Sequence, residues 1–169
     1  MDMKNKWPLI CRASLVIKMS RREIWSIISS PGNLENFHPF CESNDVSIWP
    51  GVGAKDEIRY LSGMILHRRF LIWEDLSGYS LMIGEDGGPE SYVEWHLDDS
   101  ANESTNVTIS VHPYYLKNSP LIVSSFPYVT YVRPKLNAYL KSVLTGLAYF
   151  GETGNKVSKN QFGEHSWFS

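Results

Sequence analysis

The chain has 169 residues, of which 43% are hydrophobic and 20% charged, and its formal net charge is −2. This is the composition of an ordinary globular domain, and without a basic run it gives no reason to expect nucleic-acid binding. No apolar run approaches the ~20 residues that span a bilayer, and no apolar signal-peptide segment follows the N-terminus. We therefore expect one cytoplasmic domain over residues 1–169, with a core at 9–150 and a tail at 151–169.

Residues that commonly bind metals are few and scattered. No two of the five histidines have the His-x-x-x-His spacing of a metal site, and Cys11 and Cys41 form no Cys-x-x-Cys pair. Free thiols are the usual state of such cysteines in a reducing compartment. We expect no metal and no cofactor.

The first quarter of the chain predicts one strand and two short helices. Residues 9–19 alternate loosely and are rich in Ile, Val and Leu, which favours a strand. The next four residues, Ser20-Arg21-Arg22-Glu23, have the form of a capping box and predict a helix that ends at Pro31-Gly32. Residues 33–37 can form one more helical turn, which Pro39 stops because the residue before a proline avoids the helical region.

The middle of the chain predicts an antiparallel sheet, since short strand patterns are interrupted by turn residues every 8–12 positions. The predicted strands are residues 46–49, 56–61, 64–73, 79–83, 92–97 and 105–112. Ser62-Gly63 joins the second and third of these as a two-residue hairpin turn.

One long amphipathic helix ends the domain. From Val132 its apolar stripe continues through Leu136, Tyr139, Leu140, Val143, Leu144 and Leu147. Pro120 and Pro127 precede the helix, and Pro134 suits its first turn; a start nearer Tyr128 would instead place a kink at Pro134. The stripe must be buried, and the predicted sheet is its only available partner. A curved sheet around one helix tends to leave a cavity. The tail at 151–169 is polar from Asn155 until Trp167-Phe168, and we expect a tag-like or loosely docked end.

Several motifs in this order resemble the START-like superfamily, also called SRPBCC. The N-terminal motifs are Ser20-x-x-x-Ile24-Trp25, Ser30-Pro31-x-Asn33-Leu34 and Phe37-His38-Pro39-Phe40, and the turn motif is Trp49-Pro50-Gly51-Val52-Gly53. The resemblance covers roughly residues 9–150, and the chain looks most like the polyketide cyclase/dehydrase and lipid-transport branch.

This resemblance implies an α+β, helix-grip fold with a ligand cavity. A curved antiparallel sheet of six to seven strands would wrap around the long C-terminal helix, with two short helices after the first strand. Members of the superfamily include carriers, receptors and enzymes, so function has to be argued from the site.

The predicted hairpin selects candidates for the cavity wall. A two-residue turn pairs Ile58 with His67 and places both on the same face as Tyr60. We expect this face to point inward. The opposite face would then carry a solvent-exposed ion pair between Glu57 and Arg68, which would contribute ~0.5 kcal/mol.

Two arguments disagree about the strand at 92–97. Alternation places Val93, Trp95 and Leu97 in the core, which leaves Tyr92 and Glu94 outside. The resemblance instead implies that Tyr92 and Glu94 line the cavity. A wet pocket tolerates that arrangement, whereas a dry core does not, because an unpaired buried carboxylate is costly. Both arrangements remain open at this point.

The candidate ligand-binding residues share a predicted position on the inner face or at the cavity mouth. They are His38, Phe40, Ile58, Tyr60, His67, Arg69, Tyr92, Glu94, Val107, Ile109 and Tyr139.

Three functions fit these residues. The first is a carrier or sensor that binds a small, largely hydrophobic molecule, such as a lipid or an aromatic or polyketide-like compound, in the cavity. The second is a cyclase or dehydratase with His67 or Glu94 as base and Tyr60 or Arg69 steadying an enolate. The third is a protein-interaction module or homodimer that takes no ligand.

Overall fold

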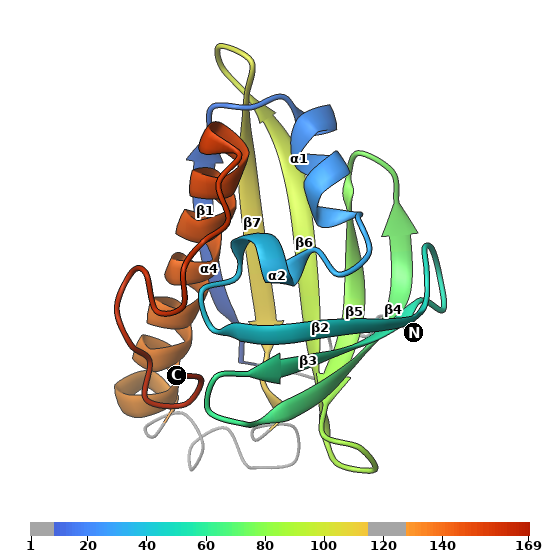
Figure 1. The fold of residues 1–169 in the computed structure, drawn as a ribbon, viewed down its shortest axis with the longest axis vertical. Coiled ribbons are helices and arrows are strands. Elements are labelled where there is room, and N and C mark those ends of the chain that lie inside the picture. The colour runs from blue at the N-terminus through green and yellow to red at the C-terminus, as the bar shows by residue number, and fades with distance from the viewer. Residues whose placement is uncertain (1–8, 115–127) are drawn as a thin grey trace.

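The computed structural model describes residues 9–114 and 128–169 (Figure 1). In chain order the elements are β1 (Cys11–Ile17), α1 (Arg21–Ile28), α2 (Leu34–Phe37), β2 (Cys41–Ile48), β3 (Lys55–Tyr60), β4 (Ile65–Glu74), β5 (Gly78–Gly84), β6 (Glu90–Ser100), β7 (Ser104–His112), the π-helical turn η3 (Tyr128–Val132) and α4 (Arg133–Thr153). Pro120 and Pro127 lie outside the described residues.

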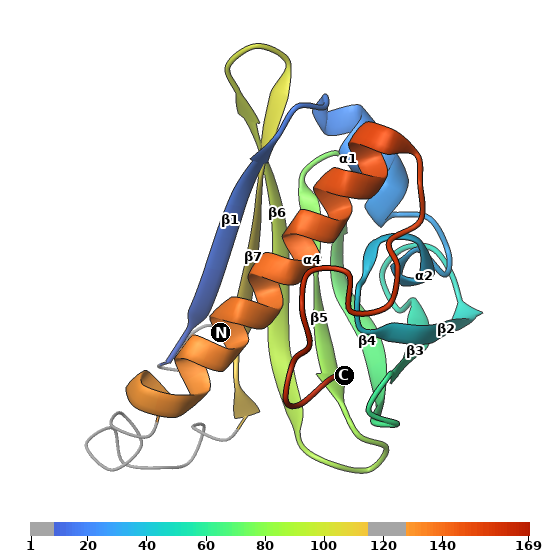
Figure 2. The same cartoon turned by 60° about the vertical axis from the view of Figure 1, so that its left-hand side comes forward.

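The seven strands form one antiparallel sheet in the order β1-β7-β6-β5-β4-β3-β2. The sheet curves, and α4 crosses its concave side, as Figure 2 shows. The predicted helix-grip architecture is therefore confirmed. In the described part of the chain, no helix is both long enough and apolar enough to cross a membrane.

The capping box at the start of α1 is confirmed. The Glu23 backbone N–H donates to the Ser20 hydroxyl oxygen at 3.3 Å, and the Ser20 N–H donates to a Glu23 carboxylate oxygen at 2.8 Å. Two backbone donors that a helix start leaves unpaired are thereby satisfied. Cys11 and Cys41 are both buried and free.

The apolar stripe of α4 forms the seam between helix and sheet. Leu140, Val143, Leu144 and Leu147 are all buried. Gly146 is needed on the same helix because a Cβ there would lie 2.0 Å from the carbonyl oxygen of Phe37, so only glycine lets α4 approach α2 this closely. Pro134 lies in the first turn of α4, as predicted, although the π-helical turn extends the helical segment back to Tyr128.

Strand β2 is longer than predicted, because it begins at Cys41 instead of residue 46. Asn44 and Asp45 favour turns, which hides the strand in the sequence. In the structure the Asn44 side-chain amide donates to the Asp56 carboxylate and to the Glu57 carbonyl, each at 3.1 Å. These bonds to β3 offset the low strand propensity of Asn44.

The expectation of a loosely docked tail is wrong. The segment after α4 runs back along the helix toward the sheet (Figure 2). The Val157 N–H donates to the carbonyl of Asn36 at 2.9 Å, and the Asn160 N–H donates to the carbonyl of Pro39 at 2.9 Å. At its end Phe168 is only 9% exposed. We call residues 155–169 the C-terminal segment.

Candidate functional site

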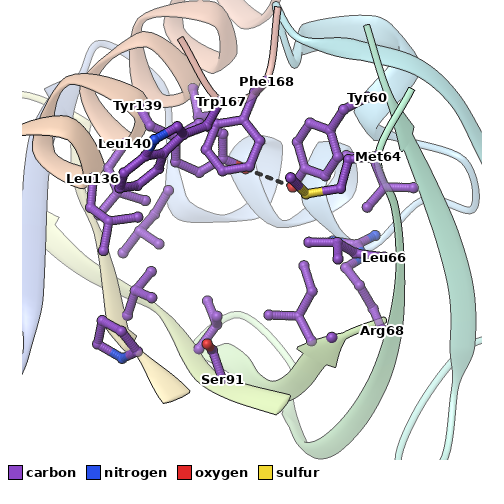
Figure 3. Close-up of a pocket in the computed structure, with 18 of the residues that line it drawn as sticks. Tyr60, Met64, Leu66, Arg68, Ser91, Leu136, Tyr139, Leu140, Trp167 and Phe168 are labelled. Atoms are coloured by element: carbon purple, nitrogen blue, oxygen red, sulfur yellow. Dashed lines mark hydrogen bonds between the residues drawn. The ribbon is translucent and has the colours of Figure 1, made fainter. Parts of the chain in front are cut away.

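A cavity of about 800 Å³ lies between the concave face of the sheet and α4 (Figure 3). Its wall is formed by β3 to β7, α4 and the end of the C-terminal segment. Most of the lining is apolar and includes Leu66, Leu81, Val93, Ile109, Leu136 and Leu140. Small-molecule sites in proteins are typically clefts of ~300–1,000 Å³ with mostly apolar walls and a few polar groups. The cavity has the size and the character of such a site.

The hairpin between β3 and β4 turns over three residues, not two. The Tyr60 N–H donates to the Met64 carbonyl at 2.8 Å, and Ile58 lies opposite Leu66. The predicted two-residue turn is therefore wrong by one position. Because successive side chains of a strand point to opposite faces, this shift exchanges the two faces of β4.

The exchange removes two predicted residues from the site. His67 and Arg69 lie on the outer face, with side chains 47% and 45% exposed, and their nearest acidic partners are Glu57 and Glu90. The prediction that they line the cavity is wrong. The predicted outer ion pair of Glu57 and Arg68 is wrong for the same reason, because Arg68 points inward.

Arg68 is held in the cavity wall by Asp56 on the neighbouring strand. Its Nε donates to Asp56 Oδ1 at 2.7 Å, and its Nη2 donates to Asp56 Oδ2. Both side chains are buried. Burial alone would lower the pKa of Arg68, but the Asp56 carboxylate outweighs that effect and raises it. No sequence pattern indicated this pair directly, since its existence depends on the hairpin register.

Three polar side chains from separate elements meet at one end of the cavity. His38 follows α2, Tyr60 ends β3, and Tyr139 belongs to the inner face of α4. His38 Nε2 lies 2.9 Å from the Tyr139 hydroxyl, which lies 3.1 Å from the Tyr60 hydroxyl. Burial, helped by the Arg68 charge, lowers the pKa of His38 to about 3, and burial raises the pKa of Tyr60 to about 12. All three groups are therefore uncharged near neutral pH.

The C-terminal segment completes this end of the cavity. The Phe168 ring lies 4.7 Å from the Tyr60 ring and 4.4 Å from the Tyr139 ring, measured between centroids. Trp167 lines the cavity beside it. Figure 3 shows both aromatic side chains next to Tyr139. Sequence reasoning missed these two residues, although a Trp-Phe pair at the end of a polar stretch was a visible sign of docking.

The arrangement of β6 settles the conflict between alternation and resemblance. Val93 and Trp95 face inward, as alternation predicted, and both line the cavity. Tyr92 and Glu94 lie on the other face of the sheet, where the Tyr92 hydroxyl donates to Glu94 at 3.4 Å and His112 Nε2 lies 3.4 Å from Glu94. Their expected place in the cavity wall is wrong, because the strand alternates without a bulge between β5 and β7.

Some of the remaining candidates line the cavity, and others pack behind its wall. Val107 is fully buried, but it packs in the core and does not line the cavity. Phe40 is also buried and stacks on Tyr139 at 5.9 Å, so it supports the wall from behind. The predicted residues that line the cavity are His38, Ile58, Tyr60, Ile109 and Tyr139.

Comparison with known proteins yields similar structures only. No family model and no curated protein matches the sequence. Among solved structures, the chain is similar to DynU16 of the dynemicin biosynthetic locus, with a TM-score of 0.66 and 20% identity over 87% of this chain. It covers 48% of DynU16, about half of that protein's length.

Two further structures match over nearly their whole length. The Aha1 dimer from Colwellia psychrerythraea has a TM-score of 0.63 at 15% identity, with 86% of this chain and 98% of Aha1 covered. Ara h 8.0201 has a TM-score of 0.64 at 10% identity, with 86% and 98% covered. At these identities the likeness establishes the fold alone. The chain shares the helix-grip fold with these structures, as the sequence motifs predicted.

Proposed function

We propose that this protein binds a small, largely hydrophobic molecule, such as a lipid or an aromatic or polyketide-like compound, as a carrier or sensor. The supporting observation is the cavity of about 800 Å³ with its mainly apolar wall. Protein interiors are normally packed to crystal-like density, so a space of this size in a core is unusual. Apolar burial would supply affinity at roughly 25 cal/mol per Å².

The charges around the cavity favour an uncharged ligand. The Arg68 guanidinium is balanced by Asp56, and His38, Tyr60 and Tyr139 are neutral near pH 7. Among the residues that the structure describes, a net charge on the ligand would therefore find no uncompensated opposite charge deep in the pocket, and it would lose its hydration. Glu85 also lines the pocket, but it is exposed at the rim.

The enzymatic alternative loses both of its candidate bases, and of its two enolate-stabilising groups only Tyr60 lines the cavity. His67 and Arg69 are on the outer face of β4, and Glu94 is on the outer face of β6. The histidine that does line the cavity, His38, has a pKa near 3 and is a weak base. These positions favour binding over the proposed cyclase or dehydratase chemistry. The interaction module and the homodimer remain predictions.

A fluorescent probe for apolar pockets tests the proposal. N-phenyl-1-naphthylamine, which is uncharged near pH 7, should bind the wild-type protein saturably and with increased emission. Leu66→Trp should weaken this binding by placing an indole ring inside the cavity, because Leu66 lines it. His67→Trp is the matched control, since it adds the same ring to the outer face of the same strand.

The outcome separates the candidate functions. Equal binding by both tryptophan variants would place the probe outside the cavity and contradict the proposal. A wild-type protein that binds no probe, and that retains no small molecule in native mass spectrometry after purification from its own host, would overturn the proposal and favour the interaction module.

A further inference from the structure

The hydrogen bonds of His38 have a fixed direction. The Phe40 backbone N–H donates to His38 Nδ1 at 3.3 Å, so this nitrogen is an acceptor and carries no hydrogen. The ring is neutral near pH 7, because burial holds the His38 pKa near 3. Its single N–H hydrogen is therefore on Nε2, and Nε2 donates to the Tyr139 hydroxyl oxygen at 2.9 Å.

A count of hydrogens then leaves one without an acceptor. The hydroxyls of Tyr139 and Tyr60 are 3.1 Å apart, and only one of their two hydrogens can lie between them. Among residues 9–114 and 128–169, neither hydroxyl has another hydrogen-bond partner. One hydroxyl hydrogen of this pair therefore remains unused at the cavity wall.

Cooperativity assigns the unused hydrogen to Tyr60. A hydroxyl that accepts one hydrogen bond becomes a better donor, so a chain is strongest when every bond points the same way. The favoured chain runs from His38 to Tyr139 and from Tyr139 to Tyr60. In this arrangement Tyr60 is the last member, and its own hydrogen is available to a molecule in the cavity.

The surroundings hold the Tyr60 hydroxyl in place. The ring packs against Phe168 at 4.7 Å and against His38 at 5.7 Å between centroids. Tyr60 lines the cavity, and the dashed line in Figure 3 marks its bond to Tyr139 at the upper wall. A donor positioned before binding loses little conformational freedom when an acceptor arrives.

We propose that the ligand carries an uncharged acceptor oxygen, such as a ketone or quinone carbonyl, and that this oxygen accepts a hydrogen bond from the Tyr60 hydroxyl. This inference rests on the proposed function, since it names the chemistry of a molecule bound in the same cavity. A carbonyl satisfies the unused donor, whereas a plain hydrocarbon leaves it unpaired in an apolar wall.

Two rigid probes of nearly identical shape test the inference. Fluorene and 9-fluorenone share one ring skeleton and differ by a methylene in place of a carbonyl. The wild-type protein should bind 9-fluorenone about tenfold more tightly, which corresponds to ~1.4 kcal/mol. Tyr60→Phe should reduce this ratio to about one while leaving fluorene affinity nearly unchanged.

Tyr79→Phe is the matched control, because it removes a buried tyrosine hydroxyl of the same sheet that does not line the cavity and leaves the donor on Tyr60. It should keep most of the preference for 9-fluorenone. The infrared carbonyl band of bound 9-fluorenone gives a readout that needs no variant, and it should shift to lower frequency relative to the band in hexane.

The possible outcomes are distinct. Equal affinity of the wild-type protein for both probes, with no shift of the carbonyl band, would overturn the inference and leave the proposed function standing. A preference that survives Tyr60→Phe would also overturn it, because another donor such as Arg68 would be responsible. Failure of both probes to bind would contradict the proposed function itself.

Discussion

The two sides of the cavity are held in place in different ways. The sheet and α4 form a continuous structure, with antiparallel pairing between all neighbouring strands and a helix stripe that includes the buried Leu140 and Leu147. The C-terminal segment has no regular secondary structure, and only His165 and Phe168 are buried within it. Segments with few buried apolar contacts open at lower free energy than the core of a domain. One side of the cavity should therefore be rigid, and the other should separate more easily.

The largest effect is expected at the helix–sheet seam. Leu140→Asp would place a carboxylate among fully buried apolar side chains, which should cost more than ~4 kcal/mol and unfold the protein. Circular dichroism during thermal unfolding measures this effect. Lys141→Asp is the control, since residue 141 is exposed on the same helix. Native-like melting of Leu140→Asp would mean that α4 does not pack on the sheet as described.

A second large effect is expected at the buried ion pair of the rigid side. Asp56→Ala leaves the Arg68 guanidinium buried without its carboxylate, which should lower the free energy of unfolding by ~3–5 kcal/mol. Urea denaturation gives the value, and Asp45→Ala on exposed β2 should change it little. If the two variants are equally stable, Arg68 is not held in the wall by Asp56.

His38 should make stability depend on pH. Its folded-state pKa is about 3, below the usual value near 6.5, so the unfolded chain takes up this proton first. The contribution of neutral His38 to the free energy of unfolding is fully present above pH 6.5. It is lost as the pH falls toward 3, by at most ~1.4 kcal/mol per pH unit.

Urea denaturation between pH 7 and pH 5 tests this dependence, because most carboxylates remain ionised in that interval. His38→Asn should show a smaller loss of stability across the interval than the wild-type protein does. Identical slopes for the two proteins would show that His38 is not buried in its neutral form.

The smallest effect on global stability, and the sharpest local one, is expected at Phe168. The Ser62 N–H donates to the Phe168 carbonyl at 3.3 Å. Because Phe168→Ala should release the end of the C-terminal segment, this amide hydrogen should exchange faster with solvent. Amides of β6 and β7 should exchange as before, because the rigid side remains closed. Phe162→Ala, at a half-buried position of the same segment, is the control. Uniformly faster exchange would show that the two sides open together.

The sequence predicted those parts of the fold that depend on local pattern. The helical spacing of α4 and the alternation along β6 correctly indicated which residues face the core, and the capping box at Ser20 correctly indicated the start of α1. In these elements the pattern spans many residues, so one ambiguous position does not change the result.

The predictions that were wrong depended on the exact length of one turn or on contacts between residues distant in sequence. Leu61 looks like a strand residue, yet it belongs to the turn, and this single position decided whether His67 or Arg68 faces the cavity. A buried arginine is costly unless paired, so Arg68 could be recognised only once its partner Asp56 was known. The docking of Phe168 on Tyr60 joins residues more than a hundred positions apart, which no local pattern reveals.

A crystal structure of the protein with 9-fluorenone would show whether the space between the sheet and α4 is a ligand-binding site. We expect the probe between the concave face of the sheet and α4, with its carbonyl oxygen within hydrogen-bonding distance of the Tyr60 hydroxyl. A cavity filled by the protein's own side chains, or a probe bound only on the outer surface, would show that this space does not bind ligands.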